Sequence, residues 1–152
     1  MNEKAKAYWD EFWKGKEQPD LVTAEQFGLE NTPMADELAQ LIVCGKKTAT
    51  CSCYDGYQWY NEDLPVVGLY TVVLNSQDEP VAIIKTTDVE VMPMNEVSVE
   101  FAAAEGEGDL SYEYWWEGHK KYFTQELAEY GKEFSEDMLL VCERFELVDV
   151  KK

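Results

Sequence analysis

The sequence predicts one α+β domain in which a small β-barrel, of mixed or antiparallel strands, is flanked by helices. The chain has 152 residues, the length of a single domain, so residues 1–152 are assigned to one unit. Hydrophobic residues make up 45% of the chain and aromatic residues 13%, enough for a core without disulfides or a structural metal. Its local patterns follow the order helix, strand, hairpin, helices and strand, which suits a small barrel with helices around it.

The first expected element is a helix over residues 5–16. Tyr8, Trp9, Phe12 and Trp13 recur there at intervals of one, three and four residues, which predicts an aromatic face. We expect this face to dock onto the domain's own core, rather than to bind a partner. The helix belongs to an N-terminal helical extension over about residues 1–30.

A second helix is the clearest element of the pattern. Thr32 can cap its start, Pro33 suits its first turn, and Gly45 is placed to end it in a left-handed conformation. The alternation of threonines with small residues over 46–53 then predicts a strand that leaves this cap.

Further along the chain, strands over 69–74 and 81–91 are joined by a predicted turn at 75–79. A short helix over 97–104 and a loop over 105–109 should follow. A helical insertion is expected at about 110–132, where residues 110–130 form one long helix. The last strand is expected over 138–148, with a bulge where its alternation slips near Glu143.

The charge balance restricts the ligands that the protein can bind. There are 31 acidic side chains against 13 basic ones, which gives a net charge of −18. Polyanions bind through an excess of Lys and Arg, so no duplex DNA partner is expected. A neutral molecule of nucleoside size meets no such repulsion.

Cysteine usage and hydropathy indicate a cytoplasmic protein with no cofactor. Cys44, Cys51, Cys53 and Cys142 do not form a disulfide pattern, and His119 is the only histidine, so no metal site is expected. No apolar run is long enough to cross a bilayer, and the N-terminus lacks a secretory signal, so no membrane partner is expected.

The first candidate for chemistry is the segment around Lys47. Strand geometry places Thr50 and Ser52 on one face, and Lys47 can reach the mouth of that face. A threonine hydroxyl needs a neighbouring base, or an amine of lowered pKa, to act as a nucleophile. The alternative is that Lys46 and Lys47 only complement the negative end of the preceding helix.

The second candidate is the loop that carries Glu105, Glu107 and Asp109. Crowded carboxylates raise one another's pKa, which can provide a general acid or base. The alternative is a solvated acidic loop. His119 and Trp116, on the long helix, are either packing residues or part of the same site.

Several of these segments together resemble the ASCH domain, a relative of the PUA fold. The segment LIVCGKKTAT over 41–50 is similar to its G-x-K-x-T/S signature, and the similarity extends from Phe27 to Val148. It is carried further by the segments 65–68, 100–109 and 143–145, and by Trp116 and His119. The chain looks like the longer bacterial branch of this family.

The resemblance implies a PUA-like barrel with a cleft, and a link to RNA binding or, in some members, RNA cleavage. Small bacterial relatives are amidohydrolases that deacetylate N4-acetylcytidine. Their catalytic Lys, Thr and Glu fall on Lys47, Thr50 and Glu105, whereas their basic residue after the motif is Ser52 here. The predicted substrate contacts are Lys46, Ser52, Glu107, Asp109, Trp116 and His119.

Three functions follow as hypotheses. The first is amide hydrolysis of a modified nucleoside or a short RNA: Thr50 attacks, Lys47 accepts its proton if burial lowers its pKa, and Glu105 orients Lys47 or serves the leaving amine. The second is a non-catalytic RNA-binding module that uses Lys46, Lys47, Lys120 and Lys121. The third is a ribonuclease that acts on single-stranded RNA. The sequence does not decide between a monomer and a homodimer.

Overall fold

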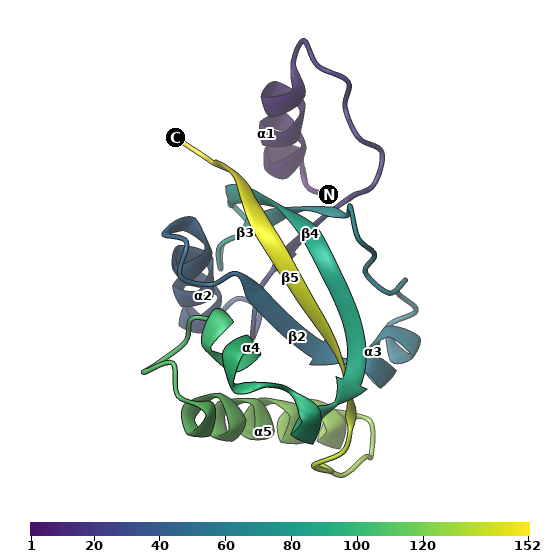
Figure 1. Cartoon of the computed structure of the whole chain (residues 1–152). Coiled ribbons are helices and arrows are strands. Elements are labelled where there is room, and N and C mark those ends of the chain that lie inside the picture. Colours follow the sequence, from purple (N-terminus) through teal and green to yellow (C-terminus); the bar gives the residue numbers. More distant parts are fainter.

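A curled five-stranded sheet forms the centre of the computed structural model, which describes residues 1–152 (Figure 1). Its strands lie in the order β1-β3-β4-β5-β2, and only the β1–β3 pair is parallel. Because β1 and β2 are opposite edges of the sheet, the expected small barrel takes the form of an open half-barrel. The strands are β1 (Val22–Gln26), β2 (Ala49–Cys53), β3 (Tyr70–Leu74), β4 (Pro80–Pro93) and β5 (Leu139–Val150).

Five α-helices surround this sheet. They are α1 (Glu3–Trp13), α2 (Pro33–Val43), α3 (Tyr54–Trp59), α4 (Val99–Ala104) and α5 (Tyr112–Glu129), with a 3₁₀ turn at Met94–Glu96. The side chains of Asn2, Ser98 and Ser111 each accept a hydrogen bond from a backbone N–H in the first turn of α1, α4 and α5. Gly45 follows α2 with a φ of 82°, in agreement with the expected left-handed end of that helix.

The helices cover different parts of the sheet. Alternation along β3 and β4 turns Val72 and Ile83 toward α1, where they pack against Ala5 and Trp9. Neighbouring positions of the same strands face the other way and pack against Leu38 and Ile42 of α2. A third cluster lies under α4 and α5, and α5 crosses the end of the molecule opposite α1 (Figure 1).

Two elements differ from the sequence-based expectation. Only Glu3–Trp13 is helical within the expected extension over about residues 1–30, because Val22–Gln26 forms β1 and pairs with β3. This short strand lacks a strong apolar alternation, and its partner lies more than 40 residues away. The helix α3 was not predicted either, and it follows β2 directly.

The expected bulge lies on the neighbouring strand. The β4–β5 ladder pairs Thr86 with Phe145 and Asp88 with Arg144, so the extra residue is Thr87 of β4. The alternation near Glu143 therefore slips without an insertion in β5 at that point. A second register shift leaves Val148 as the extra residue further along β5.

No helix combines the length and the apolar character that a membrane crossing requires. All four cysteines are free thiols.

Candidate functional site

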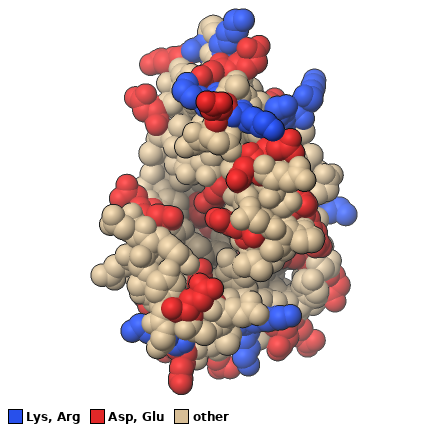
Figure 2. Space-filling model, turned by 180° about the vertical axis from the view of Figure 1, so that it is seen from behind, with Lys and Arg blue, Asp and Glu red and all other residues tan.

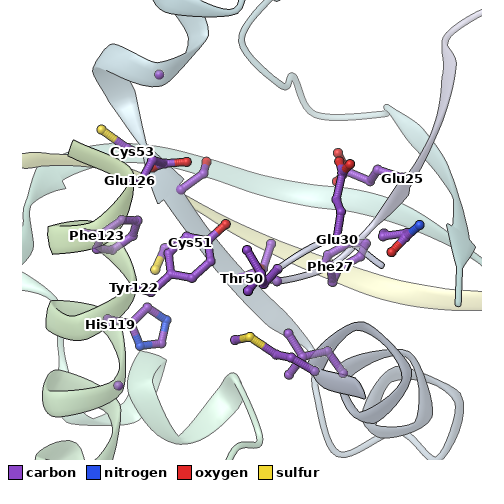
Figure 3. Close-up of a pocket in the computed structure, with 18 of the residues that line it drawn as sticks. Glu25, Phe27, Glu30, Thr50, Cys51, Cys53, His119, Tyr122, Phe123 and Glu126 are labelled. Atoms are coloured by element: carbon purple, nitrogen blue, oxygen red, sulfur yellow. The ribbon is translucent and has the colours of Figure 1, made fainter. Parts of the chain in front are cut away.

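A cavity of about 650 Å³ opens between the two edge strands of the half-barrel. It is lined by the end of β1 and the segment that follows it into α2, by β2 and α3, by one side of α5, by two residues of the 105–107 loop, and by one residue of β5. Figure 3 shows β2 crossing the cavity with Thr50 and Cys51. His119, Tyr122 and Phe123 of α5 lie on one side of β2, and Glu25, Phe27 and Glu30 lie on the other.

Lys47 is buried at one end of this cavity, with 2% of its surface exposed. Its Nζ lies 3.0 Å from Oε1 of Glu105, 3.4 Å from Oε2 of Glu107 and 3.5 Å from the backbone oxygen of Glu105. These three acceptors match the three N–H groups of an ammonium. Burial alone would lower the pKa of Lys47, but the charges of Glu105 and Glu107 outweigh it and raise that pKa. The condition under which Lys47 would accept a proton, a lowered pKa, is therefore not met, and the cationic form of Lys47 is favoured.

Glu105 is the acceptor on which this network converges. Its Oε1 accepts from Lys47, while its Oε2 accepts from the indole Nε1 of Trp115 at 2.6 Å and from the thiol of Cys51 at 3.2 Å, and lies 3.2 Å from Nε2 of His119. Burial would raise the pKa of Glu105, but Lys47, His119 and Trp115 lower it to about 2. Glu105 is thus an ionised, fully hydrogen-bonded group.

His119 faces an acceptor with each ring nitrogen. Nδ1 lies 2.7 Å from the backbone oxygen of Trp115, and Nε2 lies 3.2 Å from Glu105. Both contacts require an N–H, so the imidazolium form is favoured. Cys51, Glu105 and His119 also place potential metal ligands within 4.8 Å of one another. A metal would need an imidazole nitrogen and a thiolate without protons, whereas this arrangement holds protons on both groups.

This geometry predicts that the imidazole of His119 titrates above its usual pKa of 6.5. Burial lowers the pKa of His119, but Glu105 and Glu107 raise it by a larger amount, so the net shift is upward. Because the folded pKa is the higher one, the stabilisation is complete below about pH 6.5 and is lost as the pH rises through the folded value. NMR can follow this single histidine without ambiguity. A midpoint at or below 6.5, or one unchanged in Glu105→Gln, would contradict the network.

The 105–107 loop is held against the start of β2 by a close backbone contact. The backbone N–H of Thr48 donates to the carbonyl of Ala104 at 2.8 Å, and Gly106 lies beside the backbone of Lys46 with a φ of 75°. A Cβ at Gly106 would lie 2.4 Å from the carbonyl oxygen of Lys46. Only glycine fits this position, because both the conformation and the space exclude a side chain.

Replacing Gly106 by alanine should therefore destabilise the fold more than the same change at Gly45. Gly45 has a similar φ of 82°, but a Cβ added there would have no neighbouring atom within 4 Å, so Gly45→Ala measures the conformational cost alone, about 1–2 kcal/mol. Gly106→Ala should cost about 1–3 kcal/mol beyond that, from the backbone clash. Urea unfolding of the two variants gives the comparison, and equal losses would show that the loop can move aside.

Thr50 lines the same cavity, but it is not bonded to Lys47 or Glu105. Its hydroxyl makes no hydrogen bond within the protein, while the neighbouring Ser52 hydroxyl lies 2.7 Å from that of Tyr57. In the β2–β5 ladder Thr50 stands directly opposite Glu143, which also lines the cavity. The structure thus brings Lys47, Glu105, Glu107 and His119 together in one network and leaves Thr50 beside it with a free hydroxyl.

The remaining predicted contacts lie elsewhere. Lys46 and Asp109 are exposed and do not line the cavity, and Asp109 accepts from the backbone N–H of Ser111 before α5. Trp116 stacks on Tyr112, while its neighbour Trp115 bonds to Glu105. The four-residue spacing of Trp115 and His119 predicts that these two share a face of the helix, and their rings stack, but Trp116 rather than Trp115 was assigned to the site.

The cavity is strongly acidic. Its lining includes eight carboxylates, against the two cations Lys47 and His119. Figure 2 shows acidic side chains around and within the hollow at the centre of the rear face, and basic side chains mainly toward the ends of the molecule. The eight are Glu25, Glu30, Glu62, Glu105, Glu107, Glu126, Glu129 and Glu143.

Comparison with known proteins places this site in a family. The sequence model of the ASCH domain matches residues 23–149, and no curated protein matches the chain. The ASCH domain structure from Lactobacillus crispatus JV V101 is 36% identical, with a TM-score of 0.90 over 97% of this chain and 95% of that one. Protein EF3133 from Enterococcus faecalis V583, assigned to the family DUF984, is 45% identical, with a TM-score of 0.85 over 99% and 91%.

A more distant structure, ASCH from Zymomonas mobilis, shares the fold alone, at 14% identity and a TM-score of 0.50 over 86% of this chain and 67% of that one. The half-barrel is thus the PUA-like fold that the sequence resemblance implied. The matched segment runs from β1 to β5 and includes every residue of the buried network. The chain belongs to the ASCH domain family.

Proposed function

We propose that the cavity binds an uncharged acylated nucleoside and that Thr50 hydrolyses its amide bond, as in N4-acetylcytidine. The observation that carries this proposal is the free hydroxyl of Thr50, which lines the same cavity as the buried ammonium of Lys47. An unbonded hydroxyl can serve as the nucleophile, and a fixed cation can stabilise the oxyanion that forms when a carbonyl is attacked.

The size and lining of the cavity support a ligand of this class. A volume of about 650 Å³ suits one small molecule, and the rings of Phe27, Tyr57 and Tyr122 offer apolar surface for a base. The eight carboxylates disfavour a phosphate, because like charges repel strongly in a partly enclosed site. A nucleoside should therefore bind better than its 5′-monophosphate.

The proposed chemistry gives each charged group a defined role. The oxygen of Thr50 attacks the acyl carbon, and the C–N bond breaks to leave an acyl ester on Thr50 and the free amine, which receives the proton that the hydroxyl gave up. Water then hydrolyses the ester and restores the hydroxyl. Lys47 stabilises the oxyanion of each tetrahedral intermediate by exchanging one of its longer contacts, at 3.4 and 3.5 Å, for the substrate oxygen. Glu105 keeps Lys47 charged and in place.

The test is incubation of the purified protein with N4-acetylcytidine and a panel of other acylated nucleosides, analysed by liquid chromatography and mass spectrometry. Release of the free amine supports the proposal, and no release from any substrate of the panel would reject it. Parallel calorimetric titrations with the nucleoside and its 5′-monophosphate test the ligand class without turnover.

The alternative of RNA binding or RNA cleavage has weaker support in the site. Lys46, Lys120 and Lys121 are exposed, but Lys47 is buried between two carboxylates, so it is not part of an exposed phosphate-binding surface. Affinity for single-stranded RNA that falls steeply with salt would favour this alternative over nucleoside hydrolysis. Shortening of labelled RNA would indicate a ribonuclease.

All of these assays include a reductant, because we place the protein in the cytosol, where its free thiols stay reduced.

A further inference from the structure

The buried network around Glu105 cannot move a proton for Thr50. All three N–H groups of Lys47 are matched by acceptors, and a cation of raised pKa is not a base. The carboxylate of Glu105 lies beside four donors, so it has no free position from which to take a proton. A threonine hydroxyl needs a base to attack a carbonyl, so that base must come from elsewhere in the cavity.

Glu143 is the carboxylate that the sheet places beside Thr50. The two residues are directly opposite in the antiparallel β2–β5 pair, where facing side chains point the same way with Cβ atoms about 4.5–5.5 Å apart. Both line the cavity, and Glu143 is half-buried there. Its Oε1 accepts one long hydrogen bond, 3.4 Å from the hydroxyl of Thr86. No protein donor contacts Oε2, which is free to face Thr50.

We propose that Glu143 is the acid–base residue that serves Thr50. In the first step the carboxylate of Glu143 takes the hydroxyl proton as the Thr50 oxygen bonds to the acyl carbon. The protonated Glu143 gives that proton to the departing amine nitrogen when the C–N bond breaks. In the second step Glu143 takes a proton from water, which attacks the acyl ester, and returns it to the Thr50 oxygen. This inference rests on the proposed hydrolysis and names a residue outside the Lys–Thr–Glu set that the family resemblance implied.

The surroundings of Glu143 suit a group that changes protonation near neutral pH. Burial raises its pKa to about 7, and the hydrogen bond from Thr86 opposes that shift. The same region holds Glu25 of β1, whose pKa is raised to about 7 by burial and by the charges of Glu143, Glu62 and Glu30. The phenol of Tyr57 also lies there and is neutral, because burial raises its pKa. A pKa near the working pH is the value that favours transfer in both directions.

The test compares Glu143→Gln with Glu146→Gln on the best substrate of the nucleoside panel. Glu143→Gln should lower kcat by roughly 10²–10⁴-fold, with KM changed less than about threefold, because it keeps the shape but cannot take a proton. The wild type should lose activity on the acid side with a midpoint near pH 7, and this limb should vanish from the residual activity of Glu143→Gln. Glu146→Gln removes an exposed carboxylate from the same strand, outside the cavity, and should keep both the rate and the limb.

A second variant distinguishes the loss of the proton acceptor from a folding defect. Glu143→Asp keeps a carboxylate one methylene shorter, so it should lower kcat while the acid limb remains. Unchanged kcat in Glu143→Gln, or an acid limb that persists in it, would overturn the role of Glu143 and leave hydrolysis by Thr50 intact. A wild type that cleaves no acylated nucleoside would overturn both proposals together.

Discussion

Replacing Lys47 by methionine should lower the free energy of unfolding by about 3–5 kcal/mol, the loss expected when one partner of a buried ion pair is removed. Methionine fills much of the same volume but leaves Glu105, with 1% of its surface exposed, without its nearest cation. His119 still lies beside that carboxylate, but it contacts the other oxygen. Equilibrium unfolding in urea, followed by circular dichroism, measures the difference.

Lys46→Met is the matched control for this experiment. It removes the same charge from the adjacent residue, but Lys46 is exposed, so its loss should change stability by less than about 0.5 kcal/mol. The double variant Lys47→Met/Glu105→Gln removes the charges of both partners and should lose less stability than the sum of the two single variants. Similar small losses for Lys46→Met and Lys47→Met would mean that the buried network adds little to stability.

Replacing Thr50 by valine should abolish amide hydrolysis, with a fall in kcat of roughly 10³-fold or more, as expected when a nucleophile is removed. Valine has nearly the same shape, and the hydroxyl of Thr50 bonds to no protein group, so the fold should lose less than about 0.5 kcal/mol. Substrate affinity should remain, because the change removes attack rather than contact. Single-turnover kinetics and calorimetry on the same preparation separate these two quantities.

Thr48→Val provides the comparison on the same segment. The hydroxyl of Thr48 lies 3.3 Å from the carbonyl of Ala104, and its side chain is exposed outside the cavity. Its replacement should leave kcat within a factor of about three. If Thr50→Val keeps the wild-type rate, the nucleophile is not Thr50, and the proposed covalent step is lost.

Much of the fold was predictable because its elements carry strong local patterns. The helix from Pro33, the hairpin of β3 and β4, and the long helix α5 all follow from periodicity, caps and turn residues. The strand Val22–Gln26 was missed because it is short and its parallel pairing with β3 depends on residues about 48 positions away. The displaced bulge has a similar cause, since the slip read near Glu143 reflects an insertion in its partner strand.

The candidate site was predictable only in part. Lys47 and Glu105 were candidates from two separate segments, the family resemblance assigned them to one site, and the structure pairs them across 58 residues of sequence. Trp115 was passed over for Trp116, although the four-residue spacing from His119 favours Trp115. Nothing in the sequence marked Glu143 as a candidate acid–base residue. Its importance depends on its position opposite Thr50, which only the pairing of β2 with β5 defines.

The sequence by itself determined the α+β class, the order of most elements, the acidic character and the family to which the chain belongs. These properties depend on composition, on periodicity within short windows and on a signature of adjacent residues. Only the tertiary structure decided the protonation of the site. The pKa of Lys47 depends on whether burial or its two carboxylate neighbours exert the larger effect, and those neighbours lie 58 and 60 residues away in the sequence. Electrostatic interactions depend on distances in space, and a buried lysine becomes a base or a fixed cation according to what the fold places beside it.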